Sequence, residues 1–148
     1  MKRILFIIFN LPMLLIAQIN FQWAGSIAGN GGANSTNDLV VNKNGHVFST
    51  GSFILKTDFN PSQNLAHTFF LNGSASLYSS NIFVSKLNAN GQHLWTKEIK
   101  GNSQNAGKSI AMDNNGNLYI TGIYSNSTDF DPNAGVSTLA NSGCFVLK

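Results

Sequence analysis

Two short segments of the chain carry oxygen-bearing side chains two residues apart, directly before a proline. They are Asp58-x-Asn60-Pro61 and Asp129-x-Asp131-Pro132. In an extended segment, side chains at positions i and i+2 point to the same side. Backbone carbonyls and water would then complete the roughly six to eight oxygens that calcium prefers. Asp58, Asn60, Asp129 and Asp131 are therefore candidate calcium ligands, and the alternative is an Asx turn that ends a strand before the proline.

Both segments belong to a longer internal repeat. Residues 38–61 and 109–132 align at a single offset, which carries Asp58 to Asp129, 71 residues further along the chain. Aligned positions include two Asn-Gly pairs and a glycine in the middle of each apolar stretch. A period of this length indicates a repeated supersecondary unit.

Flanking segments extend the repeat in both directions. Trp23 aligns with Trp95 at an offset of 72, and 82–86 aligns with 144–148 at an offset of 62. The first copy therefore carries nine more residues, the difference between 71 and 62, somewhere within 62–81. We expect a surface loop or an added hairpin there, because insertions are tolerated at such places.

Four Asn-Gly pairs, at 44–45, 72–73, 90–91 and 115–116, punctuate the chain. Asn-Gly favours the positive φ angles of a type I′ hairpin turn, and three of the pairs lie between runs of β-branched and aromatic residues. The sequence therefore predicts an all-β fold with three hairpins, which join 38–42 to 46–53, 81–88 to 92–99, and 109–113 to 117–124.

The repeating unit contains four short strands. In the second copy they fall at 109–113, 117–124 and 142–148, preceded by a strand at 93–99. A four-stranded antiparallel sheet repeated along the chain is typical of a β-propeller blade. Residues 18–148 are thus predicted to form a β-propeller repeat region, with blade one at about 38–99 and an incomplete blade two at about 109–148.

Residues 1–17 read as a signal peptide, since two basic residues precede a short apolar run and a small residue. The run is too short to span a bilayer, which needs about 20 residues. The mature chain then opens with 21–27, which aligns with 93–99 and is expected to be a D-type strand, the fourth of a blade. It would complete the last blade of a full propeller, or pair with 142–148 within this chain.

Composition and scattered reactive residues argue against several functions. The formal net charge of +3 falls to about +1 once Lys2 and Arg3 leave with the signal, so a nucleic-acid partner is not expected. Cys144 is the single cysteine, and because it aligns with Ile82 we expect a small buried hydrophobe. No catalytic histidine, nucleophile or facing carboxylate pair is recognised, so we predict no enzyme activity.

Three further motifs have structural explanations. Asp113-Asn114-Asn115-Gly116-Asn117 lacks the later bidentate glutamate of a calcium loop and is interpreted as a hairpin turn. Trp23 and Trp95 are expected to pack between blades, although an indole ring can also stack on a sugar. The Asn-x-Ser/Thr patterns at Asn34, Asn72 and Asn126 indicate exposed loops.

The combined pattern resembles the SBBP family of bacterial β-propeller repeats. The residues that carry the likeness in the second copy are Trp95, Ile99, Gly101, Asp113, Gly116, Asn117, Tyr119, Thr121, Gly122, Asp129 to Pro132 and Phe145 to Lys148. Those in the first copy are Trp23, Asn42, Gly45, Gly51, Asp58 to Pro61 and Phe83 to Leu87. The resemblance implies an exported or surface protein of bacteria and brings no catalytic residues or cofactor with it.

From these observations we expect a non-catalytic binding, adhesion or scaffold module, secreted or at the bacterial cell surface. Two blades cannot close a ring that usually needs about four to eight. The chain is therefore expected to be a fragment of a longer propeller protein with further blades, or one of several chains in a ring. Whether a ligand is a protein or a carbohydrate does not follow from the sequence. The alternative is an accessory part of a secreted polysaccharide-acting enzyme.

Overall fold

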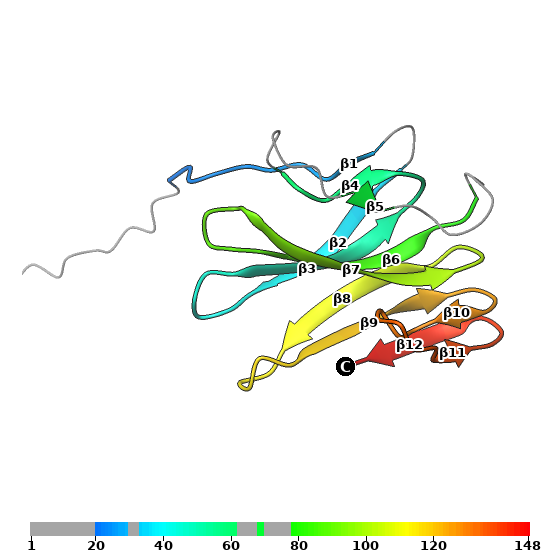
Figure 1. Cartoon of the computed structure of the whole chain (residues 1–148). Helices are drawn as coiled ribbons and strands as arrows, with labels where there is room; N and C mark the ends of the chain where they lie inside the picture. The colour runs from blue at the N-terminus through cyan, green and yellow to red at the C-terminus, as the bar shows by residue number, and fades with distance from the viewer. Residues whose placement is uncertain (1–19, 30–32, 62–67, 70–77) are drawn as a thin grey trace, which may run out of the picture.

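The computed structural model describes residues 20–29, 33–61, 68–69 and 78–148 (Figure 1). Every regular element in these ranges is a β-strand, so the all-β prediction is confirmed for them. No helix capable of crossing a membrane occurs in the same ranges. The predicted signal peptide, the Asn72-Gly73 pair and most of 62–81 lie outside the described residues.

Most strands belong to two antiparallel sheets. The long strands of sheet 1 have the order β7-β6-β3-β2, and those of sheet 2 have the order β12-β9-β8. The strands of sheet 1 are β2 (Ser35–Val41), β3 (Val47–Phe53), β6 (Asn81–Leu87) and β7 (His93–Gly101). Those of sheet 2 are β8 (Ala106–Met112), β9 (Leu118–Tyr124) and β12 (Gly143–Leu147).

Short strands lie beside these sheets at one end, some in a separate three-stranded sheet and others as an extension of sheet 1 beyond β7. β1 (Ala28–Gly29) pairs with β4 (Thr57–Asp58), which also pairs with β5 (Thr68–Phe69). In the second copy the end of β7 pairs with β10 (Thr128–Asp129), which pairs with β11 (Thr138–Leu139). In both copies, therefore, the strand that precedes the repeat unit pairs antiparallel with the short strand that carries the aspartate. This strand is β1 in the first copy and the end of β7 in the second.

The three predicted hairpins are present, but their turns differ from the type I′ prediction. Only the glycine of each Asn-Gly pair has a positive φ, between 75° and 84°. An Asx side chain at the start of each turn accepts two backbone N–H groups, two and four residues later; the Asx residues are Asn42, Asn88 and Asp113. This Asx cap favours a three-residue loop with one left-handed residue.

A β-bulge at the same place in both copies explains the mid-strand glycines. The register shifts between Thr36 and Asp38 in one copy and between Gly107 and Ser109 in the other. A Cβ atom at Gly51 would overlap the carbonyl oxygen of Ser35 across the bulge. Glycine is needed because backbone approaches backbone here, and Gly122 meets the corresponding carbonyl in the second copy.

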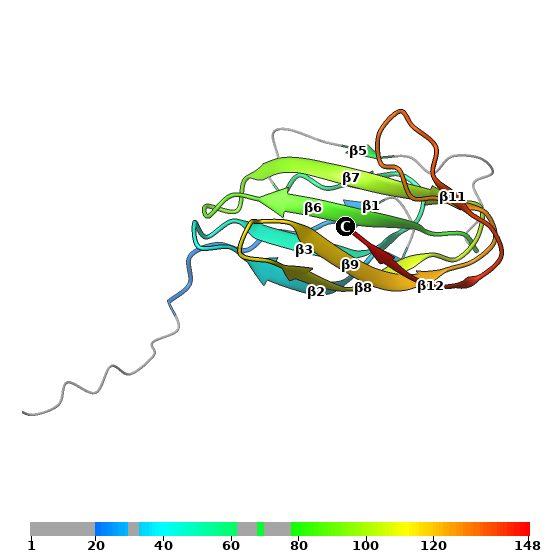
Figure 2. The same cartoon turned by 90° about the horizontal axis from the view of Figure 1, so that it is seen from below.

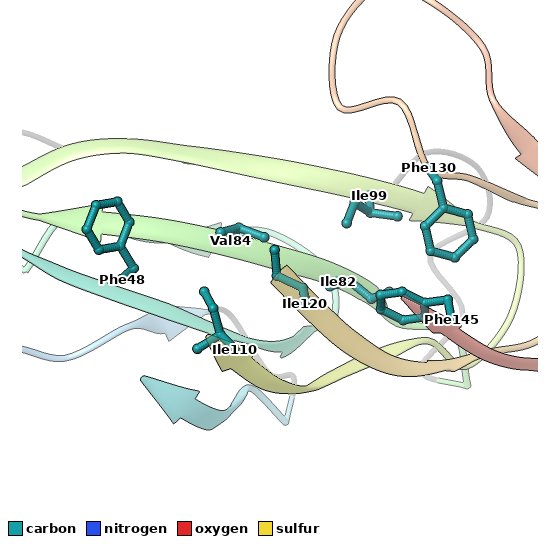
Figure 3. Close-up of a cluster of buried hydrophobic side chains, with 8 residues drawn as sticks. All are labelled: Phe48, Ile82, Val84, Ile99, Ile110, Ile120, Phe130 and Phe145. Atoms are coloured by element: carbon teal, nitrogen blue, oxygen red, sulfur yellow. The ribbon is translucent and has the colours of Figure 1, made fainter. Parts of the chain in front are cut away.

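The main core lies between the two sheets, where β8 packs against β2 and β3. Figure 3 shows its eight buried side chains, which come from both sheets: Phe48, Ile82, Val84, Ile99, Ile110, Ile120, Phe130 and Phe145. Gly107 permits this close approach, since a Cβ there would overlap the Thr50 hydroxyl. From below, the strands of the two sheets run in roughly the same direction (Figure 2), as in aligned sheet packing.

An aromatic trio builds the same small cluster in each copy. In the first copy, Phe59 lies 4.9 Å from Phe83 and 5.2 Å from Phe53, measured between ring centroids. In the second copy, Phe130 lies 4.8 Å from Phe145 and 5.5 Å from Tyr124. The phenylalanine of each Asp-Phe-Asx-Pro motif is therefore a core anchor between the second and third strands of its sheet.

The N-terminal segment differs from its prediction. Residues 21–27 carry no strand, and β12 pairs with β9 alone among the described residues. The pairing of 21–27 with 142–148 is therefore wrong. Instead the Trp23 indole N–H donates to the Ala89 carbonyl at 3.0 Å, and its ring covers Gly91. Ile27 packs on the Phe53, Phe59 and Phe83 cluster, so the segment is held on the first copy.

Candidate functional site

The two aspartate motifs are turns in the structure, as one of the two sequence interpretations proposed. Asp58 Oδ1 accepts the Asn60 N–H at 2.9 Å, and Asp129 Oδ1 accepts the Asp131 N–H at 3.1 Å. Asp129 Oδ1 also accepts the Ser137 N–H at 2.8 Å. These bonds fold the chain back after β4 and β10 and bring the buried phenylalanine into the core.

Electrostatics at the second motif favour the charged carboxylate without a metal ion. The Ser137 and Asp131 N–H groups hold the pKa of Asp129 below its usual value, with a smaller contribution from Lys100. Within the described ranges, no three His, Cys, Asp or Glu side chains gather closely enough to hold a metal ion. Calcium at Asp58, Asn60, Asp129 and Asp131 stays a prediction, because neutral oxygens and water could still supply ligands.

An asparagine and a buried threonine support each motif, and sequence reasoning missed this role. Asn105 Oδ1 accepts the Thr128 hydroxyl and the Ser125 N–H, both at 3.0 Å. In the first copy, Asn34 Oδ1 has longer contacts of 3.3 Å with the Thr57 hydroxyl and 3.4 Å with the Ile54 N–H. Asn34 is half-buried in this contact, so its Asn-Ser-Thr pattern does not mark an exposed loop. The alignment of Asn34 with Asn105 in the repeat is the sequence feature that indicates this shared supporting role.

The three Asx-capped turns gather at one end of the molecule, and two of them line a pocket. Residues 42–44 and 113–116 of these turns line an open pocket of about 390 Å³ together with Val40, Val41 and Met112. The side-chain amides of Asn44 and Asn115 are exposed at the tips, and they make no hydrogen bond to another described residue. Lys43 adds an exposed positive charge to the rim. The pocket therefore presents donors and acceptors suited to a polar ligand.

Asp113 stabilises its own turn through the hydrogen bonds that its carboxylate accepts. Its carboxylate accepts hydrogen bonds from the Asn117 amide at 2.7 Å and from the Asn115 and Asn117 backbone. These bonds, led by the Asn117 amide, hold the pKa of Asp113 below its usual value. The charge is therefore present at neutral pH, as an acceptor for the turn.

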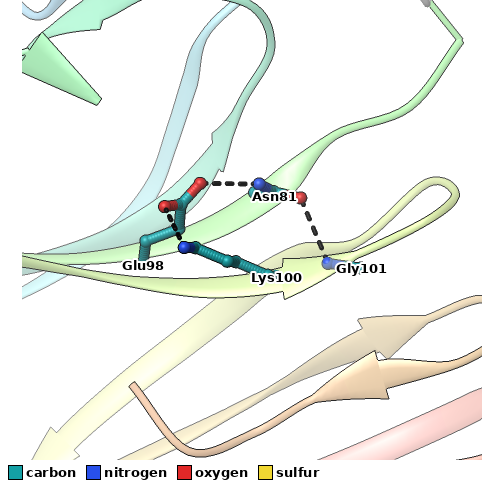
Figure 4. Close-up of polar contacts among 4 residues, drawn as sticks. All are labelled: Asn81, Glu98, Lys100 and Gly101. Carbon is teal, nitrogen blue, oxygen red and sulfur yellow. Dashed lines mark hydrogen bonds and ion pairs between the residues drawn. The ribbon is translucent and has the colours of Figure 1, made fainter. Parts of the chain in front are cut away.

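Glu98 occupies a polar site at the other end of sheet 1 that the sequence analysis did not single out. Figure 4 shows Asn81, the first residue of β6, whose amide donates to Glu98 Oε1 at 2.6 Å and whose oxygen accepts the Gly101 N–H at 3.2 Å. Lys100 Nζ lies 3.7 Å from Glu98 Oε2. Burial raises the pKa of Glu98, while Asn81 and Lys100 act in the opposite direction. The arrangement ties the two strands together and includes no second carboxylate.

Cys144 is exposed, so the prediction that it is buried is wrong. It shares one face of sheet 2 with Thr121, Ile123 and Val146, which we call the outer face of sheet 2. Ile123 is 45% exposed and Val146 is 80% exposed. Ile82, the residue aligned with Cys144, is buried because the same face of sheet 1 is covered by sheet 2. The difference comes from the neighbouring sheet and not from the strand itself.

Together the repeated strands, turns and stacked sheets define an all-β repeat protein. Residues 94–131, from β7 through β10, match the family model SBBP, described as a beta-propeller repeat. This match confirms the resemblance identified from the sequence for that part of the chain. Comparisons with curated proteins and with solved structures find no significant match.

Proposed function

We propose that this chain is a non-catalytic β-propeller segment, secreted or held at the bacterial cell surface, that serves as a binding, adhesion or scaffold module. In this proposal sheets 1 and 2 are two consecutive blades, and β8, β9 and β12 are three strands of the second blade. The beta-propeller repeat match over 94–131 and the stacking of two similar antiparallel sheets support the assignment. Export is supported by the sequence of residues 1–17 alone.

The contrast between buried repeated side chains and exposed polar turn tips supports a binding role. Repeated side chains such as Phe59 and Phe130, or Thr57 and Thr128, are buried and support the fold. The turn tips are instead exposed and carry polar side chains around one pocket. Loops on a rigid β scaffold are where recognition residues usually lie. The pocket between turns 42–45 and 113–116 is the single observation that carries this proposal.

The chemistry of the pocket suits a neutral polar ligand such as a glycan. Amide side chains donate and accept hydrogen bonds, and both actions are needed to recognise sugar hydroxyl groups. Val40, Val41 and Met112 add apolar surface for the less polar side of a sugar ring. Recognition here would therefore depend on Asn44 and Asn115.

A glycan array with the purified protein tests the proposal. We expect retention on at least one neutral glycan, and about tenfold weaker binding, a loss of about 1.4 kcal/mol, in the Asn44→Ala, Asn115→Ala double variant. These turns should survive the change, since the Asx caps use the backbone N–H of both residues. Asn90→Ala is the matched control, because Asn90 holds the same place in the turn 88–91, away from the pocket.

Two results would contradict this assignment. One is the absence of binding to every neutral glycan on the array. The other is equal weakening by Asn90→Ala, which would place recognition elsewhere or show that the turns act only through folding.

A further inference from the structure

The outer face of sheet 2 repeats a surface that sheet 1 keeps buried. In sheet 1 the corresponding side chains are Thr50, Ile82 and Val84, with exposed fractions of 0%, 0% and 6%. Their counterparts in sheet 2 are Thr121, Cys144 and Val146, all of them exposed. Cross-strand pairing is also the same, since Val84 pairs with Thr50 and Val146 with Thr121. Sheet 1 uses this surface to pack on sheet 2, so sheet 2 presents an apolar packing surface to solvent.

The opposite end of the molecule presents the complementary surface. Leu39 and Val41 align with Ile110 and Met112, which sheet 2 directs into the core between the sheets. Leu39 is 55% exposed and Val41 is 51% exposed. The protein therefore has two different exposed faces, and the contact between its own sheets shows how two such faces fit together.

Backbone edges at the two ends are complementary as well. β12 pairs with β9 on one side, and its other edge has no strand partner in the described ranges. In sheet 1 the same edge, on β6, pairs with β7, while Trp95 and Ile99 of β7 pack between the sheets. Residues 21–27, which align with 93–99, already place Ile27 on sheet 1 but have no strand partner.

We propose that the outer face and free edge of sheet 2 bind the N-terminal end of a second copy of this chain. Residues 21–27 of the second copy would pair antiparallel with β12 and complete a four-stranded sheet 2. Leu39 and Val41 of that copy would at the same time cover Val146 and Cys144. The contact leaves the sheets of both copies intact, and residues 21–27, which carry no strand in the structure, become extended when they pair.

The contact is head to tail, because it joins two different surfaces. Such a contact closes into a ring or grows into a filament, depending on the rotation between copies. The inference depends on the stacking of the sheets and not on any bound glycan.

One residue limits the fit and provides a sharp test. Gly107 allows sheet 2 to approach Thr50, and its counterpart at the other end of the molecule is Thr36. A threonine at this position of the second copy would press against Thr121. Thr36→Gly should therefore strengthen the association, whereas a substitution that only loosened the fold would not.

The alkylation rate of the native Cys144 in the purified protein measures how much of the outer face of sheet 2 is covered by a second copy. We expect the alkylation rate to fall about tenfold between low micromolar and near-millimolar protein, in proportion to the uncovered fraction. Light scattering should show association of two or more copies over the same range. Val146→Lys should keep Cys144 reactive and the protein monomeric at every concentration, and Thr36→Gly should shift the transition to lower concentration.

Val136→Lys is the matched control, since Val136 is 81% exposed and outside the outer face, and it should behave like the unchanged protein. Circular dichroism of Val146→Lys confirms that the fold is retained. A monomeric protein with concentration-independent Cys144 reactivity would overturn the proposal. So would protection of Cys144 only by an added peptide of residues 88–101, which would assign the free edge of β12 to a different strand.

Discussion

At the residue scale, aligned side chains of the two copies have the same structural role even where the residue types differ. Tyr124 replaces Phe53 in the aromatic trio, and the two ring pairs keep nearly the same edge-to-face angles of 87° and 89°. Asp113 replaces Asn42 as the cap of a turn, because both side chains offer an oxygen to two N–H groups. Chemistry conserved between copies therefore identifies a residue's role better than its type alone.

One aligned pair predicts a stabilising substitution. Leu55 and Asn126 both have a left-handed backbone, with φ of 55° and 59°. Leucine is strained in this region and asparagine tolerates it. We expect Leu55→Asn to raise the free energy of unfolding by about 0.5 kcal/mol or more in urea denaturation. The reciprocal Asn126→Leu should lower it by a similar amount, and a loss of stability in Leu55→Asn would contradict the expectation.

Sequence reasoning succeeded at this scale where a residue acts on its near neighbours. The Asx turns at Asp58 and Asp129 follow from local rules that concern the next two residues. Cys144 was misjudged because its burial depends on a sheet that lies next to it in space. The role of Asn34 does not follow from its Asn-Ser-Thr pattern, and it is indicated only by the alignment of Asn34 with Asn105.

At the element scale, bulges explain why the second strand of each copy contains a glycine. Gly51→Ala should cost about 2–4 kcal/mol of unfolding free energy, because its Cβ would overlap a backbone carbonyl that cannot move independently of the bulge. Gly116→Ala is the comparison, since it has a φ of 84° but no atom within 4 Å of the new Cβ. Only about 1 kcal/mol is expected there, from backbone strain.

Chemical denaturation of both variants measures this difference. If Gly116→Ala proved the more damaging change, backbone conformation would outweigh close approach in these sheets, and the explanation of the bulge would be incorrect.

Strand positions were largely predictable, because hairpin turns and apolar alternation are local signals. The three predicted hairpins lie within a few residues of the observed ones. The turn type was not predictable from Asn-Gly alone, since the Asx residue three places before the glycine selects a different loop. Residues 21–27 were predicted as a strand because they align with β7, but no described strand lies alongside to pair with them.

At the scale of the whole molecule, a side chain of sheet 1 bonds directly to sheet 2. Asp38 Oδ2 accepts the Ser109 hydroxyl at 2.7 Å and the Ile110 N–H at 2.9 Å. These bonds, with that from the Leu39 N–H, hold the pKa of Asp38 below its usual value. A lowered folded pKa means that the stabilisation is present above the unfolded pKa and is lost as pH falls through the folded pKa.

Thermal melting across pH tests this contact between sheets. Asp38→Ala should melt a few degrees lower than the unchanged protein at pH 7, and the difference should shrink below about pH 4 as the carboxyl takes up a proton. Lys108→Ala, an exposed neighbour on β8, should show no such trend. A difference that stays constant down to pH 2 would indicate lost packing rather than lost charge.

The first copy joins the second through two different faces, with Thr50, Ile82 and Val84 on one side of the contact and Gly107, Ile110 and Ile120 on the other. When one such unit is duplicated in the gene, the new contact between sheets is formed by two faces that are already complementary. No matching mutations are then required. Lengthening or shortening of the encoded array by recombination is therefore a small evolutionary step for this architecture.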